Sequence, residues 1–183
     1  MDLVPDPSRL SVSEVVAEFR RILRDGDRDP KRVGPLVGLL GDLHRTNISQ
    51  WSLEDDGRRP GVNDATIARA KRAIDALNTT RHHLIEAIDA GIDAATPQAP
   101  AAPPVTESPG MVLDRLSVLV IRIYHTELAA GPEPSDTDPY GARLPVLHRQ
   151  LATLEEALEA LLRDVRAGRR RFLPYQHLKL YAP

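Results

Sequence analysis

The stretch MVLDRLSVLVIRIYHTEL, residues 111–128, is the most apolar part of the chain and decides the fold that we expect. Apolar side chains lie on nearly every side of a helix drawn through it, which is typical of a helix at the centre of a bundle. Ser108 is placed to cap this helix, and Pro109 suits its first turn. Asp114 lies within it, and a buried carboxylate requires a partner. We therefore expect Asp114 to face an arginine or lysine of an earlier helix.

Four further segments repeat apolar residues at helical spacing. Ser11 followed by Glu14 forms a capping-box pattern at the start of the first segment, and Asn63 can cap the third. The four segments cover approximately residues 11–24, 35–56, 64–92 and 144–165. The sequence thus predicts an all-α, single-domain bundle of five principal helices over residues 1–183.

The segment ATPQAPAAPP, residues 95–104, separates the third and fourth helices. Its prolines favour an extended backbone, and its alanines can bury little surface. We expect an exposed, mobile linker over about residues 95–107. Neither half of the chain can cover its own apolar helices, so this linker joins two halves of one domain.

Composition restricts the classes of function. A chain of 183 residues with 42% hydrophobic content can bury a core, and its 24 basic and 26 acidic residues are interspersed, which gives no broad surface for nucleic acid. The absence of cysteine excludes disulfides and thiolate metal sites. The chain starts without a basic, apolar leader, and no apolar run approaches the roughly 20 residues that span a bilayer. We expect a cytoplasmic protein that binds neither nucleic acid nor a membrane.

The fifth helix carries an apolar seam that alternates three- and four-residue steps. Such a seam packs at a shallow angle on partner helices, either within the chain, which we favour, or in a second copy, so a homodimer stays open. The closing stretch RRRFLPYQHLKLYAP, residues 169–183, places arginines where they complement the helix end or contact phosphate, and we favour the first. The seam consists of Leu144, Leu147, Leu151, Leu154, Leu158, Leu161 and Val165.

The stretch HRTNISQWSLEDDGR, residues 44–58, gathers costly groups on one face of the second helix. Three- and four-residue steps place His44, Asn47, Trp51, Glu54 and Arg58 along that face. A fully solvated helix face would not be expected to carry the only tryptophan of the chain, because its large apolar ring favours burial. A core face rarely holds so many polar groups, because each costs about 1 to 3 kcal/mol when buried without a partner. These residues therefore form either a buried hydrogen-bond network or a ligand site.

Two more polar ribbons adjoin the expected core. Lys71, Asp75 and Asn78 follow one another along the third helix, and Arg81 lies at the edge of that row. Such a row also commonly decorates a solvated helix face, because charges four residues apart pair there. The central helix adds Asp114, Arg115 and His125.

These elements resemble a bacterial all-helical family, catalogued as a domain of unknown function, whose genes often lie near glycosyltransferases and other polysaccharide genes. The resemblance covers most of residues 36–181 and includes a His-x-x-Asn-x-x-x-Trp-x-x-Glu-Asp motif. It implies a link to glycan metabolism and a single site built from the three ribbons. Relatives tend to have Asn and then Asp where this chain has His82 and His83, which puts a carboxylate role there in doubt. The family pattern falls on His44, Asn47, Trp51, Glu54, Asp55, Arg58, Asp64, Lys71, Asp75, Asn78, Arg81, Asp114, Arg115 and His125.

The chemistry that these residues suggest is proton transfer between carboxyl and imidazole groups. Burial against Trp51 would raise the pKa of one carboxyl group, an arginine would keep a second ionised, and a histidine would carry the proton. Glycoside hydrolysis needs two carboxyl groups roughly 5 to 9.5 Å apart, which Glu54 and Asp114 on facing helices can meet. The candidate catalytic residues are Glu54, Asp55, Asp114, His125 and His44. The candidates for substrate binding are Asn47, Trp51, Arg58, Lys71, Asp75, Asn78, Arg81 and Arg115.

We therefore expect a small enzyme of hydrolase type that acts on a sugar-type or glycan-derived substrate without a cofactor. Motifs for phosphate loops, zinc proteases, serine hydrolases, dinucleotide binding and carboxylate di-iron bundles are absent. One alternative is a non-catalytic binding or scaffold protein that partners a glycosyltransferase. Another is a Mg²⁺-assisted enzyme on a sugar phosphate or nucleotide sugar, with Glu54, Asp55 and Asp114 as metal ligands.

Overall fold

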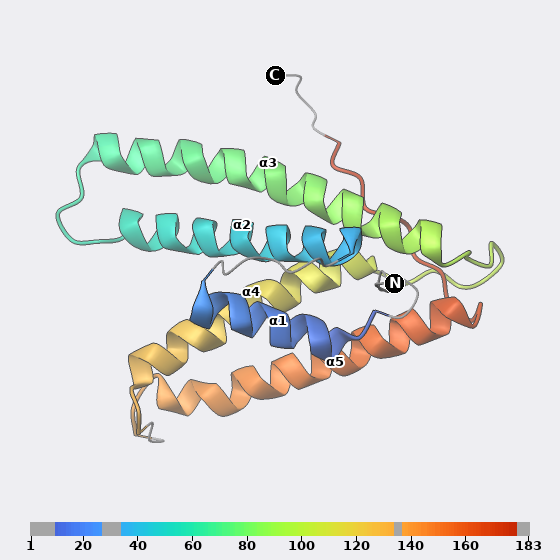
Figure 1. The fold of residues 1–183 in the computed structure, drawn as a ribbon. Helices are drawn as coiled ribbons and strands as arrows, with labels where there is room; N and C mark the ends of the chain where they lie inside the picture. Colours follow the sequence, from blue (N-terminus) through green and yellow to red (C-terminus); the bar gives the residue numbers. More distant parts are fainter. Residues whose placement is uncertain (1–9, 27–33, 134–136, 179–183) are drawn as a thin grey trace.

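The computed structural model describes residues 10–26, 34–133 and 137–178, and it confirms the predicted all-α bundle (Figure 1). Within these residues the chain forms five α-helices and one short 3₁₀ turn, with no strand beyond an isolated bridge between Pro104 and Arg171. The helices are α1 (Val12–Asp25), α2 (Pro35–Gly57), α3 (Asp64–Ala95), α4 (Pro109–Ala130) and α5 (Leu144–Arg166), and the turn is η2 (Gly141–Arg143). No helix in the described part combines the length and the hydropathy needed to cross a bilayer.

The helices begin where their capping residues predict. Ser11, Asn63 and Ser108 each accept a hydrogen bond from a backbone N–H in the first turn of α1, α3 and α4. Gly26, with φ of 65°, ends α1 as expected. The connection around Pro30 and the end of the C-terminal tail, which the sequence also addressed, lie outside the described residues.

Helix α4 lies at the centre of the bundle, as its composition predicts. It contacts α1, α2, α3 and α5, and half of its 22 residues are buried. The helices α2 and α3 form a long antiparallel hairpin on one side of α4, α5 lies on the other side, and α1 lies in front of α4 and contacts α2, α4 and α5 (Figure 1). The loop end of the hairpin projects away from the last turns of α4, so side chains near that end of α2 are covered less.

The seam of α5 packs inside the chain. Its leucines face α4 and α1, and most of them join the common core. The prediction of a homodimer was not tested, but this seam is occupied and a second copy would have to use another surface. The buried residues of α5 are Leu144, Leu147, Leu151, Leu158, Leu162 and Val165.

The segment between α3 and α4 buries more than its composition predicts. Thr96, Ala102 and Ser108 are buried, and the backbone N–H of Val105 donates to the carbonyl of Arg171 at 2.9 Å. The backbone N–H of Arg171 in turn donates to the carbonyl of Pro103, at 3.1 Å. The other residues of 95–107 are exposed or half-buried, so burial here is confined to a few side chains and to backbone contacts with the C-terminal tail. These contacts could not be predicted from the sequence, because the partner is a tail 69 residues further along the chain.

The first turn of α4 lies against the backbone of α3. The N–H of Gly110 donates to Asp89 Oδ1 at 2.7 Å, and Asp89 is fully buried with a pKa raised chiefly by that burial. A Cβ atom at Gly110 would lie 2.8 Å from Asp89 Oδ1 and 2.9 Å from the carbonyl oxygen of Ile85. Only glycine allows this approach of the two helices.

We expect Gly110→Ala to lower the free energy of unfolding by about 1 to 3 kcal/mol, because the added methyl group clashes with backbone and with a buried carboxylate. Urea denaturation measures this. Gly38→Ala is the matched control, since Gly38 lies within α2 with no atom within 4 Å of its Cβ position, and alanine there should be neutral or stabilise by up to about 1 kcal/mol. Equal stability of Gly110→Ala and the wild type would contradict the close approach.

Candidate functional site

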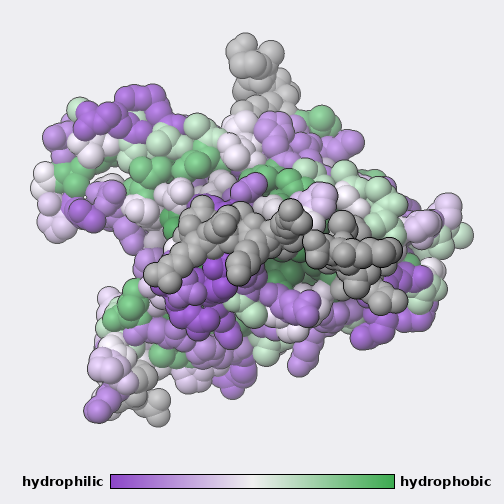
Figure 2. All heavy atoms as spheres, viewed as in Figure 1, coloured by the Kyte–Doolittle hydropathy of each residue, from purple (hydrophilic) through white to green (hydrophobic). Residues whose placement is uncertain are grey.

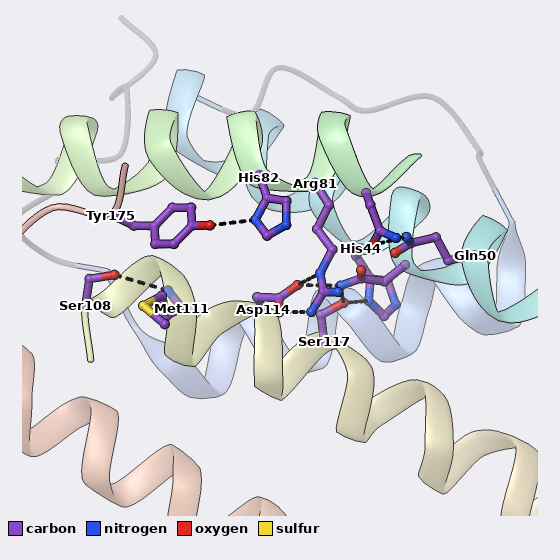
Figure 3. Close-up of polar contacts among 11 residues, drawn as sticks. His44, Gln50, Arg81, His82, Ser108, Met111, Asp114, Ser117 and Tyr175 are labelled. Atoms are coloured by element: carbon purple, nitrogen blue, oxygen red, sulfur yellow. Dashed lines mark hydrogen bonds and ion pairs between the residues drawn. The ribbon is translucent and has the colours of Figure 1, made fainter. Parts of the chain in front are cut away.

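An ion pair between a half-buried arginine and a buried carboxylate joins α3 to α4 (Figure 3). Arg81 donates from Nε to Asp114 Oδ1 at 2.7 Å and from its terminal nitrogen to Oδ2, so the guanidinium binds both carboxylate oxygens. Asn47 of α2 donates to Asp114 Oδ1 at 3.0 Å. The expectation that Asp114 faces a basic residue from an earlier helix is confirmed. This contact also raises the pKa of Arg81 above its usual value.

The same network continues one turn along α4. Ser117 Oγ accepts from Asn47 Nδ2 at 3.0 Å and lies 2.8 Å from His44 Nδ1. Since the Asn47 amino group faces a carboxylate, the orientation of this amide is fixed by charge. Asn47 Oδ1 and His44 Nε2 are buried without a hydrogen-bond partner in the described part of the chain. Each such atom costs about 1 to 3 kcal/mol, which the packing of α2 on α4 has to offset.

His44 is a neutral core residue at physiological pH. Its side chain is fully buried and stacks on Phe19 with ring centroids 4.3 Å apart. Burial lowers its pKa from 6.5 to about 4, because the surroundings cannot solvate an imidazolium. His44 was predicted as a proton carrier, and its side chain lines neither of the two hollows described below.

The burial of the polar face of α2 decreases along the helix towards the hairpin loop. His44 and Asn47 are buried, Trp51 is half-buried, and the three residues nearest the hairpin loop are exposed. Those three are Glu54, Asp55 and Arg58, and Arg58 pairs with Glu54 at 2.5 Å four residues away. The change follows from the fold, because this end of α2 projects beyond α4 (Figure 1).

Along the polar row of α3, exposure falls from the hairpin loop towards the middle of the helix. Lys71 and Asp75 are exposed and 4.0 Å apart, which is a loose surface pair. Asn78 accepts a hydrogen bond from Gln50 of α2 at 2.7 Å, and Arg81 reaches Asp114. Only the second half of this ribbon therefore contacts other helices, and only Arg81 joins the network.

A hollow of about 570 Å³ opens beside the ion pair, between α4 and α5. We call it the arginine hollow. Four arginines and one carboxylate, Asp114, line it together with apolar and uncharged polar side chains. Its lining residues are Arg81, Asp114, Arg115, Val118, Leu119, Arg122, Val146, Arg149, Gln150, Thr153 and Leu154.

A second hollow, of about 590 Å³, continues from the first and shares Arg122, Val146 and Gln150 with it. We call it the tryptophan hollow. The rings of Trp51 and His125 stack in its wall with centroids 5.1 Å apart. Figure 2 shows a notch at the left of the molecule, between the projecting hairpin and the ends of α4 and α5, the elements that line this hollow. The remaining lining residues are Thr126, Tyr140, Ala142, Arg143 and Leu147.

The predicted site residues, apart from Asn78, thus fall into three groups. One group forms the buried network, a second lines the hollows, and a third lies on the exposed end of the hairpin. The network holds His44, Asn47, Arg81 and Asp114, and Asn78 lies outside all three groups, half-buried and bonded to Gln50. The hollows hold Trp51, Arg81, Asp114, Arg115 and His125, and the exposed group is Glu54, Asp55, Arg58, Lys71 and Asp75.

The two carboxylates proposed for hydrolysis do not share a hollow. Glu54 lines neither one, and Asp114 is the only carboxylate that lines either. The described residues also contain no group of three or more His, Asp or Glu side chains placed to hold a metal ion. The set of Glu54, Asp55 and Asp114 is therefore not assembled as a Mg²⁺ site.

Several residues of interest were not predicted as site residues. Three of them line the hollows: Arg122, Arg149 and Tyr140. Only Arg122 could be suspected from the sequence, because it shares a helix stripe with Arg115. The C-terminal segment adds Tyr175, whose hydroxyl lies 2.8 Å from His82 Nδ1. These contacts join elements distant in sequence, which periodicity cannot reveal.

The fold and the site define an all-helical bundle with a buried, ion-paired network beside an arginine-lined hollow. The chain belongs to the family described as "Protein of unknown function (DUF4254)", whose model matches residues 38–173. This agrees with the resemblance to a domain of unknown function that the motifs gave. Comparisons with curated proteins and with solved structures found no match.

Removing the partner of Asp114 should destabilise the bundle. We expect Arg81→Met to lower the free energy of unfolding by about 3 kcal/mol, because it leaves a carboxylate buried with one amide donor. Glu54→Gln is the control, and its effect should stay below about 0.5 kcal/mol because the Glu54–Arg58 pair is exposed. Urea denaturation of both variants tests this, and equal effects would contradict the assigned difference in burial.

The stability of the protein should also depend on His44. Its folded pKa of about 4 lies below the unfolded value near 6.5, so the unfolded state binds more protons between these values. Above pH 6.5 the neutral His44 does not reduce the free energy of unfolding. As the pH falls from 6.5 towards 4, protonation of His44 in the unfolded state lowers that free energy by up to about 1.4 kcal/mol per pH unit.

We expect His44→Gln, which cannot titrate, to show a shallower loss of stability than the wild type between pH 6.5 and 5. Urea denaturation at stepped pH gives both slopes. His83→Gln serves as the control because the His83 side chain is 65% exposed, and it should keep the wild-type slope. Parallel slopes for the wild type and His44→Gln would show that His44 is not the group responsible.

Proposed function

We propose that this protein binds a phosphorylated sugar-type ligand in the arginine hollow. The observation that carries the proposal is the charge of the lining, which has four arginines against one aspartate. The whole chain has a net charge of −2, so this concentration of positive charge does not follow from composition. A concave surface lined by one sign of charge attracts ligands of the opposite sign.

The arginines differ in how far they are already paired. Arg81 binds Asp114 through both nitrogens, and Arg115 contacts Glu107 at 2.5 Å. Arg122 and Arg149 have no acidic partner among the residues that the structure describes. These two guanidinium groups, one on α4 and one on α5, are available for an anion.

Phosphate suits such a hollow better than an uncharged sugar. A guanidinium presents two parallel N–H groups that match two oxygens of a phosphate, and a charged hydrogen bond is worth about 1.5 to 3 kcal/mol. Val118, Leu119 and Leu154 supply apolar walls for a carbon skeleton. The sugar-type class comes from the family resemblance, which implies a link to glycan metabolism.

Binding is better supported than hydrolysis by paired carboxylates. Both oxygens of Asp114 accept hydrogen bonds from Arg81, which leaves this group as an anchor for the helices. An acid–base enzyme is the second candidate, and one observation favours it: His125 lines the tryptophan hollow next to the arginine hollow. Binding without turnover also fits the alternative of a protein that serves a glycosyltransferase.

Replacing the two unpaired arginines tests the proposal. We expect sugar phosphates to raise the melting temperature of the wild type, while the corresponding unphosphorylated sugars leave it unchanged. The double variant R122Q/R149Q should bind the sugar phosphate at least roughly tenfold more weakly, since two charged hydrogen-bonding groups are lost. Titration calorimetry gives the affinities.

The control is R72Q/R163Q, which removes the same charge from two exposed arginines that line neither hollow. It should bind like the wild type. The proposal is wrong if no phosphorylated sugar stabilises the protein, or if R122Q/R149Q and R72Q/R163Q weaken binding equally. The second result would indicate general charge attraction without a site.

A further inference from the structure

We infer that the ligand is a nucleoside diphosphate carrying a sugar, with its nucleobase in the tryptophan hollow and its diphosphate at Arg122 and Arg149. This inference rests on the proposed function and specifies its ligand. Its first support is continuity, because the two hollows share Arg122, Val146 and Gln150 and so form one groove. A ligand held by Arg122 therefore borders both hollows.

The two ends of the groove differ in chemistry. The tryptophan hollow holds Trp51 and Tyr140, although only 4% of the chain is aromatic, and two arginines, Arg122 and Arg143, line it as well. The arginine hollow has no aromatic lining. A ligand that matches both ends has an anionic part and a flat ring part, which are the two parts of a nucleotide.

The aromatic lining is suited to a base. Nucleobases stack on aromatic side chains with little dependence on sequence, because every base has a π-face. Trp51 already stacks on His125, with 9° between their planes, and Arg143 lies over the Tyr140 ring at 5.4 Å, so a base has to stack on the opposite face of either ring; Tyr140 is 44% exposed. Gln150, which lines both hollows, adds an amide that can pair with a base edge.

The groove is also long enough for an extended ligand. Asp114 lines one hollow and Thr126 the other, and both lie on α4. At about 1.5 Å of rise per residue, they are separated by roughly 18 Å along the helix axis. A sugar phosphate alone would fill one hollow, whereas a base, a diphosphate and a sugar joined in a row use both.

Three probes and one natural reporter test this inference. Inorganic diphosphate, uridine diphosphate and glucose 1-phosphate are titrated into the full chain by calorimetry. Trp51, the only tryptophan, reports the tryptophan hollow through its fluorescence. We expect uridine diphosphate to bind at least about tenfold more tightly than inorganic diphosphate and to quench Trp51, while inorganic diphosphate binds without quenching.

A variant then locates the base. Tyr140→Ala removes a ring that is nearly half exposed, so the fold should survive. It should abolish most of the advantage of uridine diphosphate while leaving the affinity for inorganic diphosphate unchanged. Leu128→Ala, which removes an exposed apolar side chain of α4 that lines neither hollow, is the control and should change neither affinity.

The outcomes separate the inference from the proposed function. Equal affinities for the two diphosphates, with no quenching, would overturn the inference and leave anion binding intact. Tighter binding of glucose 1-phosphate with quenching of Trp51 would overturn it too, since the ring in the tryptophan hollow would then be a sugar. Binding of none of the three probes would contradict both.

Discussion

The structure depends on one constraint, which is the neutralisation of a carboxylate inside its most apolar helix. Asp114 is 4% exposed, and an isolated charge at such a position would be too costly for the fold to keep. Arg81 from α3 and Asn47 from α2 both reach it, so satisfying this one group fixes the hairpin on α4. The register of α2, α3 and α4 therefore depends on charge as well as on packing. A shift of one helical turn would leave the Asp114 carboxylate buried without its partners.

The position of the hollows follows from the same geometry. Because the hairpin is tied to α4 at Asp114, α2 and α4 diverge towards the hairpin loop, and α5 packs on the far side of α4 (Figure 1). Side chains of α4 that point between these elements, such as Arg115 and Arg122, are left along an opening instead of in the core. The network and the groove therefore adjoin each other on α4, and Asp114 belongs to both.

The fold was largely predictable from the sequence, whereas the site was predictable only in part. Helix limits and the central place of α4 follow from capping residues and periodicity, which are local signals. The pairing of Asp114 with a basic residue was predictable because burial of a charge leaves few solutions. Glu54 shares a helix face with His44 but not its surroundings, because periodicity assigns a face and says nothing about how far the partner helix extends. Arg149 was not predicted for a related reason: it is an exposed residue beside the seam of α5, and the sequence does not show which helix lies opposite it.

The paired carboxylate also shapes the electrostatics of the groove. Arg81 has its charge balanced at short range by Asp114, so it adds little net potential at the arginine hollow. Arg122 and Arg149 lie on facing helices and have no acidic partner among the described residues, so their charge is not balanced there at short range. An anion between them would link α4 to α5 much as Asp114 links α4 to the hairpin, by a charge that bridges two helices. The Asp114 contacts in the core and an anion between Arg122 and Arg149 would thus be interactions of the same kind, in which a negative charge bridges two helices.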